Sequence, residues 1–518
     1  MLQLSFTVAI CGFLAYQALL IIYRLTFHPL AKFPGSPLAA ATKWYEFFFD
    51  VCKGEGGQYA WEIQRMHEKY GPIIRINPDE LHIKDSSYFH TIYAPLPARR
   101  DKWPPAAAMT GSSKGTFGII DHFSHRKCRA ANSPLFSTKR VTDAQPQVYG
   151  RVQRLCDAIS EHHKNGSVLR VHVDVLAFTT DLMTTWILGE PLGCQDDVAI
   201  AEAWYATSQC LPRITPFVKQ FPWIVTLALK LPVSLIQAVM PNLASLVSLR
   251  KSMYTAHQRH TSRKASSAAG SSEEKMDGMF PTVFDVLDNS SLPASEKDVD
   301  RQAQEAFVLV AGGTETTART ITSCMFQLVS NPSIYARLRA ELKEVMPDPK
   351  SEPSLKTLEN LPYFTAVLKE NLRSMHLMTS RFPLRAHNDL QYKEWTLPKM
   401  WPVSMTVSEV LLDGDIFEDP KAFKPERWLT DDNKLQEDYR AAFVPFGRGT
   451  RACQGQSIAW AKMYICVAQL VRRFDFSLFE TTYARDFKVT RDCFLGVPSE
   501  QSKGIRMLVT RDYALEDS

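Results

Sequence analysis

Residues 446–455 read Phe446-Gly-Arg-Gly-Thr-Arg-Ala-Cys453-Gln-Gly455. The glycines let the chain turn sharply with bare backbone, because they carry no Cβ. Cys453 places a soft sulfur ligand in this turn, and the apolar residues from Ile458 to Cys466 predict a helix whose amino end favours a thiolate. The stretch therefore indicates either a sulfur ligand for a metal or an inert buried cysteine in a glycine-rich turn.

The spacing Phe-x-x-Gly-x-Arg-x-Cys-x-Gly is expected by chance in roughly one chain in ten thousand of this length. It resembles the haem-binding loop of the cytochrome P-450 superfamily, and the match is complete. The resemblance implies that Cys453 is the axial ligand of haem b iron, where a thiolate favours O–O cleavage. It also implies that Phe446 covers the sulfur and that Arg451 reaches a haem propionate. The implied fold is mainly α with a smaller β-rich lobe (α+β), preceded by one transmembrane helix.

Composition places the chain among ordinary globular enzymes, with 518 residues of which 45% are hydrophobic and 22% charged. The net charge of +5 is small and no Lys/Arg-rich run occurs, so a nucleic-acid partner is not expected. Ten cysteines are scattered without a C-x-x-C pair or zinc spacing. Neither a disulfide framework nor a zinc site is indicated, and a reducing, cytosol-facing environment fits best.

The amino-terminal segment predicts a membrane anchor, because residues 2–23 carry no charged side chain and about 20 helical residues cross a bilayer core. A cleaved signal peptide is the alternative, but no basic residue precedes the apolar run. A single pass through the endoplasmic reticulum membrane with a cytosolic body is expected, so the sequons at Asn165 and Asn289 should stay unmodified. The basic residues that favour this orientation follow the run: Arg24, His28, Lys32 and Lys43.

Three segments are expected along the chain: the anchor at 1–24, a proline-containing hinge at 25–45, and the haem-thiolate catalytic domain at 46–518. The prolines of the hinge predict a stiff, extended linker. Beyond it, 59–70 predicts a helix and 73–83 predicts strands of the small lobe.

Residues 93–121 are loop-like, and in the family such a region roofs the substrate pocket. Residues 140–260 predict mostly helix, with an apolar lid near their end. Residues 261–279 are rich in Ser, Ala, Gly and charged residues, which predicts a flexible surface loop.

His125 and Arg129 lie four residues apart and share one face of a predicted helix. Two such side chains can hold haem propionates, and the resemblance favours this role over a solvated basic patch. Arg126 and Lys127 would point elsewhere, toward an acidic redox partner.

A long helix predicted over 300–328 contains Gly312-Gly313-Thr-Glu315-Thr316-Thr near its middle. Paired glycines and polar residues are unfavourable there, and such local conflict is typical of working sites. The segment matches the family's oxygen-activation motif. The resemblance implies that the glycines let the helix pass close over the haem, that Thr316 hydrogen-bonds dioxygen and that Glu315 relays protons. A polar interruption facing a neighbouring helix is the alternative.

Glu370 and Arg373 share a face of a helix predicted over 361–375, and Arg427 follows downstream. The resemblance implies a buried triad that braces the segment before the cysteine loop, which makes these residues structural. A further propionate ligand is expected at Arg385, with Arg381 as the second choice.

Two segments are expected to line an apolar pocket above the iron, which favours a lipophilic substrate. They are Met378-Thr379-Ser380 with Phe382, and Phe494-Leu495-Gly496-Val497.

The leading hypothesis is a membrane-anchored haem-thiolate monooxygenase that inserts one oxygen atom from O₂ into a lipophilic fungal secondary metabolite, a terpenoid or polyketide intermediate. No dinucleotide fingerprint occurs, so NADPH would act through a separate NADPH-cytochrome reductase. Two alternatives are a haem-thiolate isomerase or dehydratase that does not use O₂, and a non-catalytic haem-binding membrane protein.

Overall fold

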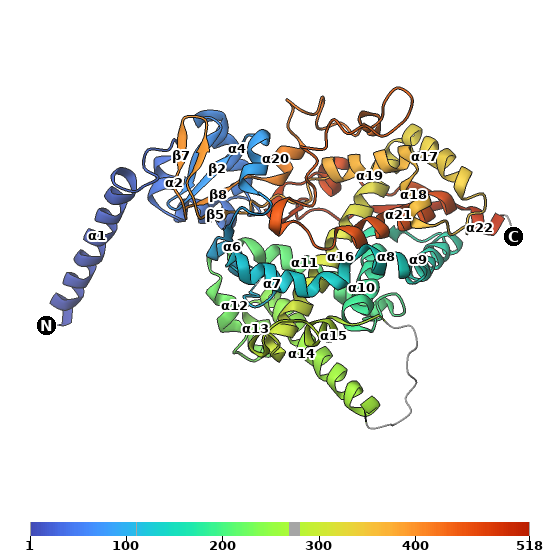
Figure 1. The fold of residues 1–518 in the computed structure, drawn as a ribbon, viewed down its shortest axis with the longest axis horizontal. Coiled ribbons are helices and arrows are strands. Elements are labelled where there is room, and N and C mark those ends of the chain that lie inside the picture. The colour runs from blue at the N-terminus through green and yellow to red at the C-terminus, as the bar shows by residue number, and fades with distance from the viewer. Residues whose placement is uncertain (1, 110, 269–279, 517–518) are drawn as a thin grey trace.

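The structure is a computed structural model that describes residues 2–109, 111–268 and 280–516. A large helical body carries a smaller β-rich lobe, and the long helix α1 (Leu2–Thr26) extends away from both (Figure 1). The predicted mainly α fold with a β-rich lobe is confirmed.

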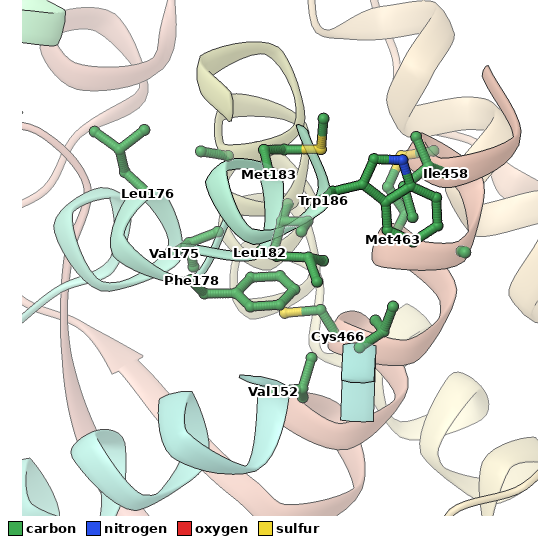
Figure 2. Packing of buried hydrophobic residues seen from close by; sticks show 14 of the residues in the cluster. Val152, Val175, Leu176, Phe178, Leu182, Met183, Trp186, Ile458, Met463 and Cys466 are labelled. Atoms are coloured by element: carbon green, nitrogen blue, oxygen red, sulfur yellow. The ribbon is translucent and has the colours of Figure 1, made fainter. Parts of the chain in front are cut away.

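The helical body is built around α16 (Val299–Ser330), against which α10 (Val171–Leu188), α19 (Pro362–Ser374) and α21 (Gln456–Arg473) pack. Almost all of α10 is buried, as expected for a helix with apolar residues on every side. Helix α9 (Gln145–Asn165) packs on α21. The shared core is seen in Figure 2, where these side chains from α9, α10 and α21 meet: Val152, Phe178, Leu182, Met183, Trp186, Ile458, Met463 and Cys466.

The β-rich lobe holds a five-stranded sheet in the order β1-β2-β8-β5-β3. Strands β1 (Ile73–Asn77) and β2 (Glu80–Ile83) pair antiparallel, and every residue of both is buried. Strand β8 (Pro402–Ser404) runs parallel to β2, and β5 (Leu384–Ala386) joins β8 to β3 (Arg100–Lys102). The central strands are covered on both faces, so polar residues such as Glu80 and His82 of β2 are buried together with the apolar ones.

The predicted helices over 59–70, 300–328 and 361–375 are confirmed as α4 (Tyr59–Tyr70), α16 and α19, and the helix after Gly455 is α21. The remaining helices are α2 (Pro37–Ala41), α3 (Trp44–Phe47), α5 (Phe89–Ile92), α6 (Pro104–Ala108), α7 (His122–Asn132), α8 (Thr138–Asp143), α15 (Val283–Asp288), α17 (Pro332–Val345), α18 (Leu355–Glu359), α20 (Val407–Leu411) and α22 (Tyr513–Glu516). The remaining strands are β4 (Leu169–Arg170), β6 (Leu390–Tyr392), β7 (Trp395–Leu397), β9 (Phe474–Leu478), β10 (Arg491–Cys493), β11 (Leu495–Val497) and β12 (Arg506–Asp512).

The helices predicted after residue 190 are α11 (Val198–Gln220), α12 (Trp223–Ala228), α13 (Val233–Val239) and α14 (Pro241–Ala268). The prediction of a loop over 261–279 is wrong for residues 261–268. Helix α14 continues to Ala268, because no Gly or Pro ends it earlier. Ion pairs also hold that part of α14 to the body: Arg263 with Glu190, and Lys264 with Asp288. The rest of the predicted loop lies outside the described residues.

The extended linker predicted after the anchor is also wrong. Residues 27–33 form turns, and the side chains of Leu30 and Phe33 are buried in the core of the β-rich lobe. His28 is buried beside Trp401, with ring centroids 4.5 Å apart. Burial of these side chains outweighs the preference of the neighbouring prolines for an extended chain.

Candidate functional site

A cavity of about 510 Å³ lies between the 446–455 turn and the middle of α16. Its lining is mostly apolar and comes from the 109–117 loop, α11, α14 and the segments around Phe382 and Phe494. Of the residues predicted to line it, Met378, Phe382, Phe494 and Leu495 do so. Thr379 and Ser380 instead donate hydrogen bonds to Asp492 Oδ1, at 2.9 and 2.6 Å.

The cysteine turn depends on a glycine that no other residue can replace without strain. Gly449 has a φ of +71°, and a Cβ there would lie 2.5 Å from the carbonyl oxygens of Tyr93 and Ala94. The turn is closed by the amide of Cys453, which donates to the carbonyl of Phe446 at 2.8 Å. The local backbone therefore presents the sulfur to the cavity.

The Cys453 thiol is open to the cavity but enclosed by protein on its other sides. Burial raises its pKa, while the Gly455 amide and the charges of Arg129 and Lys462 act in the opposite direction. Arg129 also supports the turn, because its Nη1 donates to the Ala452 carbonyl at 2.6 Å. A soft metal bound to the sulfur would remove the thiol proton and complete the stabilisation.

The structure brings His125, Arg129 and Arg451 to one side of the cavity together with Lys102, which the sequence analysis did not single out. Burial lowers the pKa of His125 to about 2, that of Arg451 to about 10, and that of Lys102 well below its usual range. Within the described part of the chain, Lys102, Arg129 and Arg451 form no salt bridge, and Arg451 Nε has no hydrogen-bond partner.

This cluster of positive side chains fits an anionic cofactor. Buried cations without carboxylate partners are costly, so a bound group that carries two carboxylates would relieve several of them at once. The cluster lies on the lining of the same cavity as Cys453. Haem b, with two propionates and an iron that accepts a thiolate, satisfies both features.

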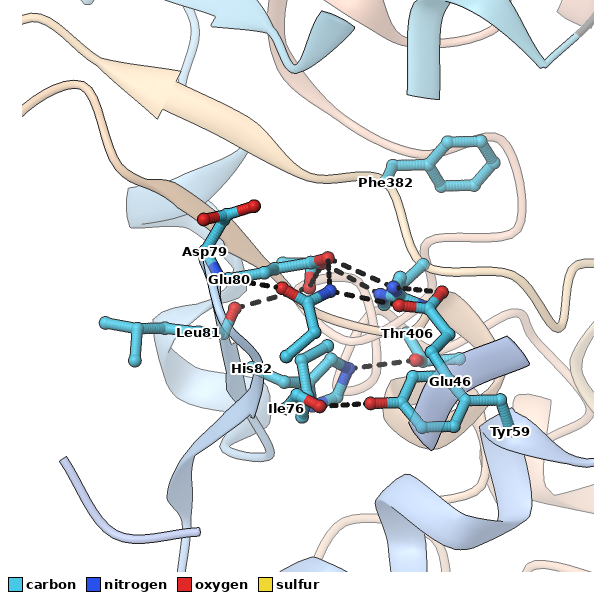
Figure 3. Close-up of polar contacts among 12 residues, drawn as sticks. Glu46, Tyr59, Ile76, Asp79, Glu80, Leu81, His82, Phe382 and Thr406 are labelled. Atoms are coloured by element: carbon cyan, nitrogen blue, oxygen red, sulfur yellow. Dashed lines mark hydrogen bonds and ion pairs between the residues drawn. The ribbon is translucent and has the colours of Figure 1, made fainter. Parts of the chain in front are cut away.

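Arg385 and Arg381 are not brought to the cavity. Leu384 lines it, and in strand β5 the next residue, Arg385, points to the other face. Arg381 is buried in the β-rich lobe, where it lies 2.8 Å from both Glu46 and Glu80. Figure 3 shows the polar cluster around these two carboxylates. The sequence analysis missed this because a one-residue shift along a strand reverses the side chain.

The two glycines of α16 do different things. Gly312 lines the cavity, and open space lies where its Cβ would be. Gly313 also lines the cavity, but a Cβ there would lie 2.5 Å from Cε of Met183 on α10. Gly312 therefore leaves room above the sulfur, whereas Gly313 allows α10 and α16 to pack closely.

Thr316 and Glu315 both line the cavity, one helical turn beyond Gly312. The Thr316 hydroxyl donates to the Gly312 carbonyl at 2.7 Å. Glu315 Oε1 lies 2.6 Å from Arg319 Nε and 3.3 Å from His172 Nε2. Burial opposes ionisation of Glu315, but these two partners outweigh it and lower its pKa to about 2. Glu315 is thus an ion-paired carboxylate, and His172 is a partner that no motif indicated.

Glu370, Arg373 and Arg427 do meet beneath this site. Arg373 donates to both oxygens of Glu370, at 2.7 and 2.8 Å, and Arg427 Nε donates at 3.1 Å. Trp428 Nε1 and the Lys424 amide donate to the same carboxylate at 3.0 Å. The segment that leads to the cysteine turn is therefore joined to α19 by a buried, fully bonded carboxylate.

Comparison with known proteins agrees with this geometry. The family model for cytochrome P450 matches residues 41–501. The chain is 37% identical to a tryptophan 6-hydroxylase of Fusarium equiseti over 95% of this chain and 94% of that protein. It is 35% identical to a cytochrome P450 monooxygenase of Sordaria araneosa, over 96% of each chain. It is also 35% identical to a conidiogenone synthase of Penicillium rubens, over 96% of this chain and 98% of that protein.

These matches cover the cysteine turn, α16 and the bracing cluster in one continuous alignment of almost the whole chain. The chain therefore belongs to the cytochrome P450 family and is a monooxygenase, an oxidoreductase whose family implies a haem-thiolate iron centre.

Proposed function

We propose that this chain is a membrane-anchored monooxygenase that transfers one oxygen atom from O₂ to a neutral, lipophilic secondary metabolite, a terpenoid or polyketide intermediate. The observation that carries the proposal is the apolar cavity with Cys453 on one side and Thr316 on the other. The balanced reaction consumes O₂, two electrons and two protons, and gives the hydroxylated product and one water.

Haem b would be held by Cys453 through sulfur and by His125, Arg129, Lys102 and Arg451 through its propionates. When bound, it supplies the reduction and cleavage of dioxygen. Phe446 lines the cavity beside the sulfur and restricts water from it. The bracing cluster around Glu370 holds the turn in place, so that the sulfur does not move when the charge at the site changes.

Thr316 and Glu315 would manage protons on the opposite wall. The Thr316 hydroxyl donates its proton to the Gly312 carbonyl. In that state it would accept a hydrogen bond from an ordered water, and by rotating away from Gly312 it would donate to dioxygen. Glu315 is ionised beside Arg319 and His172, so a proton relayed from solvent through Glu315 would require this ion pair to open. Removal of the Thr316 hydroxyl should therefore divert electrons to peroxide.

The substrate class follows from the lining above the sulfur. Lys102, Arg129 and Arg451 all act on the charge of His125 and therefore lie at one side of the cavity, where the cofactor carboxylates are expected. The lining residues of α11 and α14 that the structure describes are uncharged, among them Trp204, Ile214, Val218, Leu246 and Leu249. A free amino acid would leave its carboxylate without a partner there. A neutral apolar metabolite is therefore favoured.

The anchor and its partners complete the proposal. The span Ser5–Thr26 is long and apolar enough to cross a membrane, and none of it is buried against the body. We place residues 1–24 in the endoplasmic reticulum membrane as a single pass, residues 25–45 as a connecting segment and residues 46–518 in the cytosol. Electrons would come from NADPH through a separate cytochrome reductase. An unmodified Asn165 and Asn289 in the native host would agree with this orientation.

The test uses the full-length, haem-loaded protein. Reduced protein under carbon monoxide should show the far-shifted Soret absorption of thiolate ligation. Terpene and polyketide intermediates should displace the iron-bound water and shift the optical spectrum, whereas tryptophan should not. With the substrate that binds, product should require NADPH and O₂, and Thr316→Ala should lower product per NADPH about tenfold or more. Product without O₂ would instead establish an isomerase or dehydratase.

A further inference from the structure

One buried lysine near the sulfur lacks a carboxylate partner. Lys462 lies on α21, nine residues after Cys453, lines the cavity and has no exposed surface. Its Nζ donates to the carbonyl of Gly313 at 2.6 Å. Across the described ranges of the chain, Lys462 forms no salt bridge. A buried ammonium group is costly unless another negative charge compensates it.

Cys453 lines the same cavity as Lys462. As an iron-bound thiolate, Cys453 would bring a negative charge to this cavity. A positive charge buried on the cavity wall would stabilise that thiolate, and the thiolate would in turn stabilise the buried ammonium group.

The carbonyl that Lys462 contacts belongs to the working turn of α16. On its other side, Gly313 packs against Met183 of α10, and α21 buries Met463 and Cys466 in the core beside α10 (Figure 2). Gly313 is thus held between two helices, and Glu315 and Thr316 follow it directly. A hydrogen bond from α21 to this carbonyl ties the helix that follows the cysteine turn to α16.

We propose that Lys462 is a positioning residue of the monooxygenase site, whose ammonium group compensates the thiolate of Cys453 and ties α21 to the Gly313 turn of α16. This inference rests on the proposed function, because it requires haem iron on Cys453. Removal of the positive charge makes the addition of an electron near the sulfur less favourable, since reduction adds negative charge to the site. Removal of the hydrogen bond also loosens the wall that holds Thr316.

The experiment compares Lys462→Gln, Lys462→Met and Lys462→Arg in the full-length holoenzyme. Lys297→Gln is the matched control, because Lys297 Nζ also donates to backbone carbonyls, those of Asp288 and Ser290, but does not line the cavity. Spectroelectrochemical titration should show that Lys462→Gln shifts the reduction potential by ~59 mV to more negative values. This corresponds to an about tenfold smaller equilibrium constant for one-electron reduction. Lys462→Arg and Lys297→Gln should stay close to the wild-type potential. Lys462→Met should lower product per NADPH further than Lys462→Gln, because it cannot donate to Gly313.

The outcomes separate this inference from the proposed function. If all variants show thiolate ligation under carbon monoxide but Lys462→Gln keeps the wild-type potential, the role of Lys462 is wrong and the monooxygenase site stands. If the wild-type protein itself lacks thiolate ligation, the proposed function fails and the inference fails with it. Should Lys462→Met not retain haem, the comparison between the shifted potential expected for Lys462→Gln and the unchanged potential expected for Lys462→Arg still decides.

Discussion

The Glu370 carboxylate shows how a single buried charge organises the cysteine turn. It accepts hydrogen bonds from Arg373, Arg427, Trp428 and the Lys424 amide. Arg373 has no exposed surface, and its other hydrogen bonds go to carbonyls of the segment before the turn, including that of Pro420 at 2.8 Å. Every polar group is satisfied only while all members are present.

Arg373→Ala should therefore yield protein that does not retain haem. The change leaves Glu370 and the Pro420 segment without their main donor, and breaking such a buried pair costs about 3–5 kcal/mol. Haem per polypeptide, measured by absorbance against protein concentration, should fall close to zero. The control is Arg440→Ala, because Arg440 and Glu437 form an exposed pair at 3.2 Å. Full haem occupancy in the Arg373 variant would disprove the bracing role.

At the scale of elements, α20 carries an uncompensated carboxylate into the β-rich lobe. Glu409 is nearly buried, and its Oε2 has no hydrogen-bond partner among the residues that the structure describes; His82 Nε2 lies 3.9 Å away. Burial raises the pKa of Glu409 to about 7, although Lys84 and Gln64 act against it, and burial keeps the pKa of His82 far below its usual range. The neutral imidazole therefore cannot compensate the carboxylate.

Glu409→Gln should make stability less dependent on pH. The folded wild type holds the Glu409 proton more tightly than the unfolded chain, so its stability falls as pH rises from about 4.5 to about 7 and stays reduced above that. The variant should match the wild type near pH 4.5 and be more stable at pH 8, by up to about 3 kcal/mol. Thermal midpoints at the two pH values measure this, with the exposed Glu437→Gln as control. A difference independent of pH would contradict the prediction.

At the scale of the whole molecule, the anchor helix and the body share a small but specific junction. Arg75 is almost completely buried, and its Nη1 donates to the carbonyl of Arg24 at 2.7 Å. Arg24 Nη1 in turn donates to the Ala41 carbonyl at 2.8 Å. The body therefore begins at the last turn of α1, before the boundary that the hinge prolines indicate.

Two truncations test this boundary. Deletion of residues 2–22 should release the protein from carbonate-washed membranes without changing its thermal midpoint, because Arg24 and Leu30 remain. Deletion of residues 2–30 should also lower the midpoint, since Arg75 loses an acceptor and the Leu30 pocket opens, at a cost of about 1–3 kcal/mol for each. Equal midpoints for the two truncations would show that the junction contributes nothing.

Local sequence was sufficient wherever one residue type is physically required. Only a glycine-rich turn places Cys453 at a helix start, and apolar periodicity predicted α16, α19 and α21 closely. The cluster of Glu370, Arg373 and Arg427 was predicted from the family resemblance, and it can be buried because the two guanidinium groups compensate the carboxylate. The helices depend on neighbours within a few turns of chain. The sequence by itself therefore determined these helices and, through the complete cysteine motif and its resemblance to the cytochrome P450 family, the fold class.

Only the tertiary structure decided which cations reach the cavity and which carboxylates they meet. Arg385 was expected there, but strand geometry turns it away and Lys102 of β3 lines the cavity instead. His172 and Lys462 come to Glu315 and Gly313 from helices far away in the sequence. Likewise, Leu30 and Phe33 fold the expected linker back onto the lobe. Side-chain direction and long-range burial set these contacts, and neither is encoded by the spacing of residues along the chain.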